Sequence, residues 1–124
     1  MAHHLTNADL HSHSTVSDGT LAPEAVAALA AERGVELWAL TDHDEVAGQA
    51  RARAAAHAAG LDHLTGCEIS VSFAGETVHI VGLGFDDTDA ALVQGLADTR
   101  AGRLQRAREM GEGLARVGIP GAFE

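Results

Sequence analysis

Several histidines and acidic residues of this chain lie beside short apolar runs, in a pattern suited to metal binding. His11 and His13 are two residues apart, His43 follows a short apolar run, and Glu68 lies within another. Side chains two residues apart in an extended segment point to the same side, so the first pair can share one ion. Mixed imidazole and carboxylate ligands suit zinc, manganese or iron rather than a closed thiolate zinc site. The pattern therefore predicts a metal site.

Two further residues extend this candidate ligand set. Asp18 lies in a Ser-Asp-Gly loop segment, and His79 lies in the middle of an apolar Val-His-Ile run. Each candidate alone has a simpler interpretation: Asp18 can cap local amides in a turn, His79 can be a hydrogen-bonded strand histidine, and Glu68 can be a rim carboxylate. The combination favours a metal cluster, because four separate segments each place a ligand-type residue beside a predicted strand end. A carboxylate such as Glu68 can bridge two ions, an arrangement typical of phosphoester hydrolysis.

The elements that must position these residues alternate between strand and helix. The sequence predicts strands over 7–10, 37–40, 64–72 and 77–83, helices over 22–33 and 46–59, a turn over 74–76, and a helical region over 86–117 that three glycines weaken. Alternation favours a parallel sheet with crossover helices, whose ligands gather at the carboxyl ends of the strands. We therefore predict an α/β fold with mostly parallel strands and a β-hairpin. Residues 1–85 would form a metal-binding unit, and residues 86–124 a helical segment.

The charge of the chain is uneven. The formal net charge is -10, yet five of the eight basic residues, all arginines, lie in residues 99–124. An acidic surface repels phosphate and nucleic acid, whereas bound divalent metals reverse that sign locally. Arg100 and Arg103 are candidates to contact a nucleotide phosphate. Their spacing also fits a solvated helical face, which is the preferred interpretation.

Composition indicates one domain of modest core size. The chain has 124 residues, of which 46% are hydrophobic and only 3% aromatic, so the core must be aliphatic. Neither a membrane span nor a secretion signal is expected, and a single cysteine fits a reducing compartment, so we predict a cytoplasmic protein. No role is assigned to the remaining histidines, His3, His4, His57 and His63.

Five short motifs together resemble those of the PHP (polymerase and histidinol phosphatase) metallo-phosphoesterases. The subgroup that they resemble contains bacterial 3′,5′-nucleoside bisphosphate phosphatases and related 5′-to-3′ exoribonucleases. The resemblance covers roughly residues 7–120, and its motifs are residues 9–14 (DLHSHS), 17–19 (SDG), 40–44 (LTDHD), 66–69 (GCEI) and 78–82 (VHIVG).

The resemblance implies a distorted (β/α)7 barrel that holds up to three divalent ions, with manganese, zinc and iron as candidates. By that likeness His11 and His13 bind the first ion, Asp18 and His43 the second, Glu68 bridges the first and third, and His79 binds the third. Asp42 and Asp44 are candidates to orient the imidazoles, although Asp42 could equally cap a strand end.

The family's remaining ligands are a histidine and an Asp-x-His pair from later strands, and no histidine follows His79 here. We therefore expect the N-terminal part of a barrel, whose missing half is absent or comes from another molecule, with self-association through an unpaired strand edge. The expected activity is hydrolysis of a nucleoside 3′,5′-bisphosphate or of short RNA ends. The alternatives are a non-catalytic metal-binding or interaction fragment, a phosphatase of the histidinol-phosphate type, and histidines that are unrelated surface features.

Overall fold

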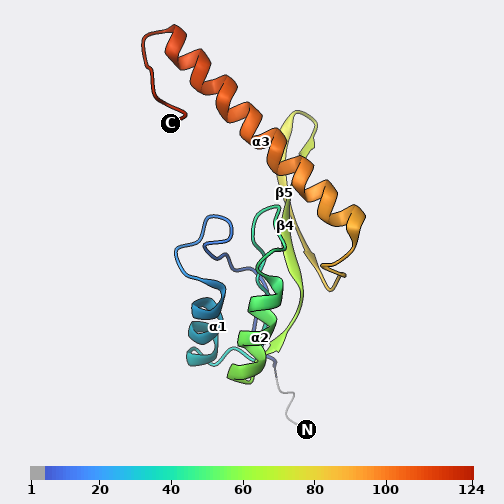
Figure 1. The fold of residues 1–124 in the computed structure, drawn as a ribbon. Coiled ribbons are helices and arrows are strands. Elements are labelled where there is room, and N and C mark those ends of the chain that lie inside the picture. Colours follow the sequence, from blue (N-terminus) through green and yellow to red (C-terminus); the bar gives the residue numbers. More distant parts are fainter. Residues whose placement is uncertain (1–4) are drawn as a thin grey trace.

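The computed structural model describes residues 5–124 and shows alternating strands and helices followed by a hairpin and a long helix (Figure 1). His3 and His4 lie outside the described residues. The elements are β1 (Ala8–Asp9), α1 (Pro23–Glu32), β2 (Leu37–Trp38), α2 (Gln49–Ala59), β3 (Asp62–His63), β4 (Gly66–Phe73), β5 (Glu76–Leu83) and α3 (Ala90–Arg116). This order confirms the predicted α/β class with its hairpin and its final helical segment.

Two sheets carry the strands. β1, β2 and β3 form a parallel sheet in that order, whereas β4 and β5 form an antiparallel hairpin that turns at Ala74 and Gly75. An isolated parallel bridge between His43 and Glu68 joins the segment after β2 to β4. This bridge therefore connects the parallel sheet to the hairpin.

The predicted strand over 64–72 is confirmed from Gly66 onward as β4, whereas residues 64 and 65 lie in no strand and separate β4 from the short β3. The buried Gln49 amide donates to the carbonyl oxygens of Leu40 and Gly66, both at 2.9 Å. It thus links the segment after β2 to the start of β4. Any side chain at Gly66 would meet backbone as well, since a Cβ there would lie 2.9 Å from the Leu40 carbonyl oxygen. The sequence did not indicate that Gln49, a polar residue in an alanine-rich helix, would make these bonds to the strands.

Small side chains let the two short helices pack closely on the parallel strands. α1 begins at Pro23, which needs no backbone donor in the first turn, and α2 ends at Gly60 with a left-handed φ of 75°. Both boundaries follow the predicted signals, although α2 begins three residues later than expected. The main core cluster comprises Ala27, Ala30, Trp38, Leu40, Ala52, Ala56 and Leu61.

α3 runs unbroken through its internal glycines, so their helix cost is outweighed by the alanine, leucine, arginine and glutamate around them. Asp89 caps it by accepting a hydrogen bond from the Leu92 backbone N–H at 2.8 Å. Its buried residue, Leu96, packs with Val46 and Cys67. Figure 1 shows α3 crossing the hairpin and extending beyond it. None of the helices in residues 5–124 combines the length and apolarity that crossing a bilayer requires.

Candidate metal centre

All six predicted ligand residues meet at one end of the parallel strands. His11 and His13 follow β1, Asp18 lies in the next loop, and His43 follows β2. Glu68 and His79 come from β4 and β5. The carboxyl ends of parallel strands share one edge, which is why residues from distant segments converge there.

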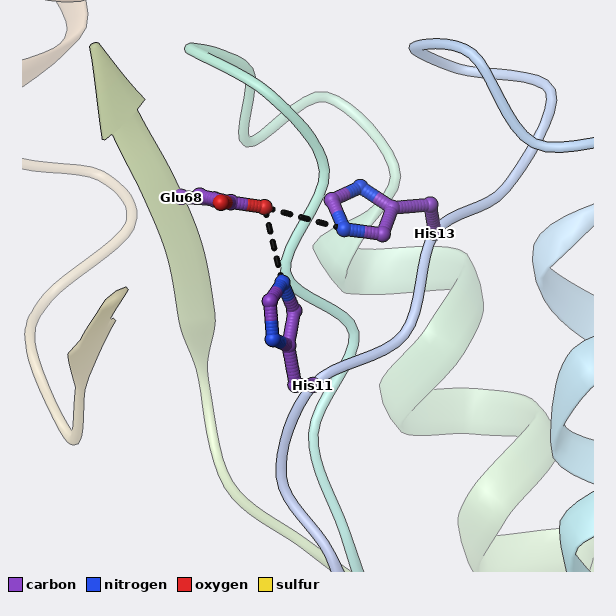
Figure 2. A group of neighbouring side chains, drawn as sticks. All are labelled: His11, His13 and Glu68. Carbon is purple, nitrogen blue, oxygen red and sulfur yellow. Dashed lines mark hydrogen bonds and ion pairs between the residues drawn. The ribbon is translucent and has the colours of Figure 1, made fainter. Parts of the chain in front are cut away.

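Glu68 lies at the centre of this cluster. Its Oε2 atom is 2.8 Å from Nε2 of His11 and 3.0 Å from Nε2 of His13 (Figure 2). The same oxygen is 3.7 Å from Nε2 of His43, while Oε1 is 3.4 Å from Nδ1 of His79. One carboxylate therefore faces four imidazoles, two of which point at it from the loop after β1.

Asp18 closes the other side of the cluster. Its two carboxylate oxygens lie 3.6 Å from Nδ1 of His13 and 3.5 Å from Nε2 of His43. Separations near 3.5 Å are long for hydrogen bonds. They match the edge of a tetrahedron of ligands at about 2.1 Å from a central ion, which is roughly 3.4 Å.

Three overlapping groups of ligand atoms result, each with all its atoms within 4.8 Å of one another. They are His11, His13 and Glu68; then His13, Asp18 and His43; then His43, Glu68 and His79. A neutral imidazole offers one lone pair, so His13 and His43 can each serve only one ion. If each of the three groups is to keep at least two ligands, only one of them can have all three.

The electrostatics of the cluster favour cations. Burial of Glu68 opposes its ionisation, but the hydrogen bond from His11 and the charges of His43, His11 and His13 outweigh burial and lower the pKa of Glu68. Nδ1 of His13, which faces Asp18 at 3.6 Å, is buried and finds no hydrogen-bond partner within residues 5–124. Unpaired buried nitrogens are costly, and a bound ion would use such a lone pair. The residues present thus fit divalent metal ions.

Asp42 binds the loop that carries Asp18. The buried Asp42 carboxylate accepts hydrogen bonds from the Ser14 backbone N–H and hydroxyl, both at 2.7 Å, and from the Ser17 hydroxyl at 2.6 Å. These are the hydrogen bonds that Asp42 makes among residues 5–124, so its orienting of an imidazole stays a prediction. Ser14 and Ser17 were not among the predicted site residues; their sequence positions beside His13 and Asp18 are the signal that points to them.

The same loop depends on a close approach of backbone to backbone at Gly19. A Cβ at Gly19 would lie 2.5 Å from the His13 carbonyl oxygen. The Gly19 N–H also donates to the Ser14 carbonyl oxygen at 2.8 Å. Glycine after Asp18 thus lets the loop fold back over the histidines.

Asp44 connects the cluster to α3. It is fully buried and adopts a positive φ of 50°, and its carboxylate accepts from the Ser70 backbone N–H at 2.7 Å. Its other oxygen accepts from Arg103 at 2.8 Å, and its carbonyl oxygen accepts from Arg100 at 2.6 Å. The Asp44 carboxylate is thus bonded to a strand amide and an arginine, and its orienting of an imidazole stays a prediction. Both arginines are held beside the candidate metal ligands.

A cavity of about 250 Å³ opens where the arginines meet the cluster. Asp18, His43, Glu45, Arg100 and Arg103 are among the residues that line it. Two cations and two candidate metal ligands thus share one cavity. The guanidinium groups of both arginines bond to Asp44 and Glu45, so these two side chains are held in place and do not form a solvated face.

The fold and the cluster define an α/β protein with a histidine–carboxylate centre at its strand ends. Comparison with known proteins agrees: residues 9–109 match the PHP domain, and the chain belongs to this family. The resemblance noted from the five motifs is thereby confirmed.

Relatives within the family include two bacterial enzymes. The chain is 52% identical over 120 residues to the 3′,5′-nucleoside bisphosphate phosphatase of Chromobacterium violaceum, covering 97% of this chain and 42% of that protein. It is 44% identical over 116 residues to the 5′-3′ exoribonuclease of Haemophilus influenzae, covering 94% of this chain and 42% of that protein. The chain thus spans about two fifths of the length of these relatives.

Solved structures show the same correspondence. An amidohydrolase from Chromobacterium violaceum matches with a TM-score of 0.85 at 53% identity, over 94% of this chain and 41% of that chain. A protein from Bifidobacterium adolescentis, described as a metal-dependent phosphoesterase, matches with a TM-score of 0.80 at 34% identity, over 88% of this chain and 38% of that chain. These matches confirm the predicted fold class, part of the barrel of the PHP family.

Proposed function

We propose that this chain provides metal-binding residues of a phosphoesterase that hydrolyses phosphate esters of nucleotides. The observation that carries the proposal is the convergence of four imidazoles on the Glu68 carboxylate, beside a cavity lined by Arg100 and Arg103. Support also comes from the relatives, whose names state action on nucleoside bisphosphates and on RNA.

The six ligand residues would divide among up to three divalent ions, for which manganese, zinc and iron are candidates. His11, His13 and Glu68 would hold one ion; Asp18 and His43 would hold a second; His79 would hold a third together with the other oxygen of Glu68. This division uses each imidazole once, as a single lone pair requires. The second and third positions keep only two ligands each from this chain, so other groups must complete them.

Bound ions would supply Lewis acidity, lowering the pKa of a water and offsetting charge on phosphoryl oxygens. The chain's own part is positioning. Glu68, kept ionised by the imidazoles around it, sets the spacing of the ligands. Asp42 holds the loop of Asp18 in place through Ser14 and Ser17.

Arg100 and Arg103 would bind the phosphate of the substrate. Arg103 is fixed by the Asp44 carboxylate and Arg100 by the Asp44 carbonyl oxygen and by Glu45 at 3.3 Å. A guanidinium has five N–H donors, so each group retains donors that can face the cavity. Arginines held in this way can bind phosphoryl oxygens without first losing side-chain freedom.

The substrate would be a nucleoside 3′,5′-bisphosphate or the end of a short RNA. We propose a cytoplasmic location, supported by the free and buried thiol of Cys67. Residues 1–85 would form the barrel portion, and residues 86–124 the beginning of a helical insertion. The outer edge of β5 is unpaired within the described residues and would accept a further barrel portion or a second copy of the chain.

Metal content and hydrolysis test this proposal together. Elemental analysis of untagged protein should find manganese, zinc or iron, and substitution of His11 and His43 by alanine should remove it. Hydrolysis of adenosine 3′,5′-bisphosphate by this chain, alone or mixed with the remaining portion of a relative's barrel, should follow the metal content. Unchanged metal content in the double variant would refute the site. Bound metal without any hydrolysis would favour the non-catalytic metal-binding alternative.

A further inference from the structure

A second cavity, of about 220 Å³, lies between the β4–β5 hairpin and α3. Four hydroxyl side chains line it together with one arginine and one carboxylate, the residues being Ser70, Val71, Ser72, Thr77, Asp98, Thr99, Gly102 and Arg106. The Asp98 carboxylate accepts a hydrogen bond from the Gln94 amide at 2.8 Å. Hydroxyls can both donate and accept hydrogen bonds, and they suit a polar ligand with ribose and phosphate groups. The metal centre described above does not use this cavity.

Arg106 differs from the two arginines that precede it on α3. Arg100 and Arg103 are bonded to Asp44 and Glu45, whereas Arg106 makes no ion pair or hydrogen bond with its side chain among residues 5–124. All five donors of its guanidinium group therefore remain available to an anion. A free cation is notable in a chain whose net charge is -10, because most of the surface repels anions.

The two cavities are neighbours along α3. Arg103 lines the cavity at the metal ligands, and Arg106 lines the second cavity three residues later, a rise of about 4.5 Å along the helix axis. Asp44 connects the two cavities. One of its carboxylate oxygens accepts from Arg103, which lines the first cavity, and the other accepts from the backbone amide of Ser70, which lines the second. A chain of linked phosphates leaving the first cavity would thus meet Arg106 next.

We propose that this second cavity binds the nucleotide next to the phosphate held at the metal centre, so that the chain grips single-stranded RNA over more than one residue. Arg106 would contact the adjoining phosphate, and the hydroxyls of Ser72, Thr77 and Thr99 would contact the ribose. This inference rests on the proposed function, because it takes the metal centre as the position of the reacting phosphate. It predicts a preference for an RNA end over a single nucleotide.

The test compares a five-nucleotide RNA with one nucleotide. The RNA carries a 5′-phosphate and a 3′ fluorophore, and its affinity for the full chain is measured by anisotropy in EDTA over a range of salt concentrations. Adenosine 5′-monophosphate, which lacks an adjoining phosphate, is titrated separately by calorimetry. Arg106→Ala should weaken RNA binding roughly five- to tenfold, lower the salt slope by about 0.7, and leave monophosphate affinity unchanged. Arg116→Ala, on the same helix but outside both cavities, should change neither.

A second pair of variants tests the cavity without removing charge. A Cβ at Gly102 or at Gly95 would meet no other atom within 4 Å, and only Gly102 lines the cavity. Both substitutions by glutamine should favour the helix. Gly102→Gln should fill the cavity and weaken RNA binding several-fold, while Gly95→Gln should not.

Several outcomes would overturn the inference. They are failure of the unmodified chain to bind the RNA, equal weakening of RNA and adenosine 5′-monophosphate by Arg106→Ala, and equal effects of the two glycine variants. None of them bears on the metal content of the protein, so failure here is distinguishable from failure of the proposed function.

Discussion

Replacing Asp42 tests how the ligand loop is held. The Asp42 side chain is 1% exposed and accepts three hydrogen bonds, two from Ser14 and one from Ser17. Asp18, by contrast, has a side chain that is 67% exposed, so packing does little to hold it in place. We therefore expect Asp42→Ala to loosen the loop and to weaken binding of the ion that Asp18 would share with His43.

The size of the effect follows from the donors left behind. Ser14 is fully buried, and its N–H and hydroxyl would each lose an acceptor at a cost of about 1–3 kcal/mol. Ser17 is only half-buried, so its hydroxyl can turn to water. Asp42→Ala should thus destabilise the fold by about 3–4 kcal/mol. Asp42→Asn keeps one oxygen as an acceptor and should cost about 1–2 kcal/mol.

Urea unfolding in EDTA measures the free energy of unfolding without metal, and manganese titration measures the affinity for the ion. Asp62→Ala serves as a control, since Asp62 is an exposed aspartate of β3. In the asparagine variant, which should remain folded, manganese affinity at the second position should fall by about tenfold, the equivalent of roughly 1.4 kcal/mol. Equal midpoints for Asp42→Ala and Asp62→Ala, together with unchanged metal affinity, would refute this reasoning.

Three further predictions concern other parts of the molecule. Gln49→Leu would leave the carbonyl oxygens of Leu40 and Gly66 without their donor and should lower the free energy of unfolding by about 2–4 kcal/mol; urea midpoints equal to those of the unmodified chain would contradict this. Burial raises the pKa of the Cys67 thiol to about 11, so iodoacetamide at pH 8 should modify it slowly in the folded chain and rapidly after denaturation; fast reaction of the folded chain would show the opposite. Ile80 on β5 is 52% exposed beside an edge left unpaired within the described residues, so sedimentation should show association that rises with concentration and falls in Ile80→Lys; a monomer at all concentrations would count against it.

Local sequence signals predicted element boundaries well where the residue that gives the signal fixes its own backbone conformation. Proline at the start of α1 and glycine at the end of α2 act through φ alone, so both boundaries were foreseen. The link that the Gln49 side chain makes between α2 and the start of β4 was not foreseen. A bond between residues 17 positions apart leaves no periodic trace in either segment.

The types of residue that can bind metal were readable in the sequence, since imidazoles and carboxylates beside apolar runs have few other uses in combination. Only the tertiary structure placed His11, His13, His43 and His79 around one carboxylate, because that depends on how parallel strands align their ends. The roles of the two buried aspartates were likewise decided in three dimensions. Their partners are hydroxyls, amides and arginines that lie up to 59 positions away, and a linear pattern does not record such pairings.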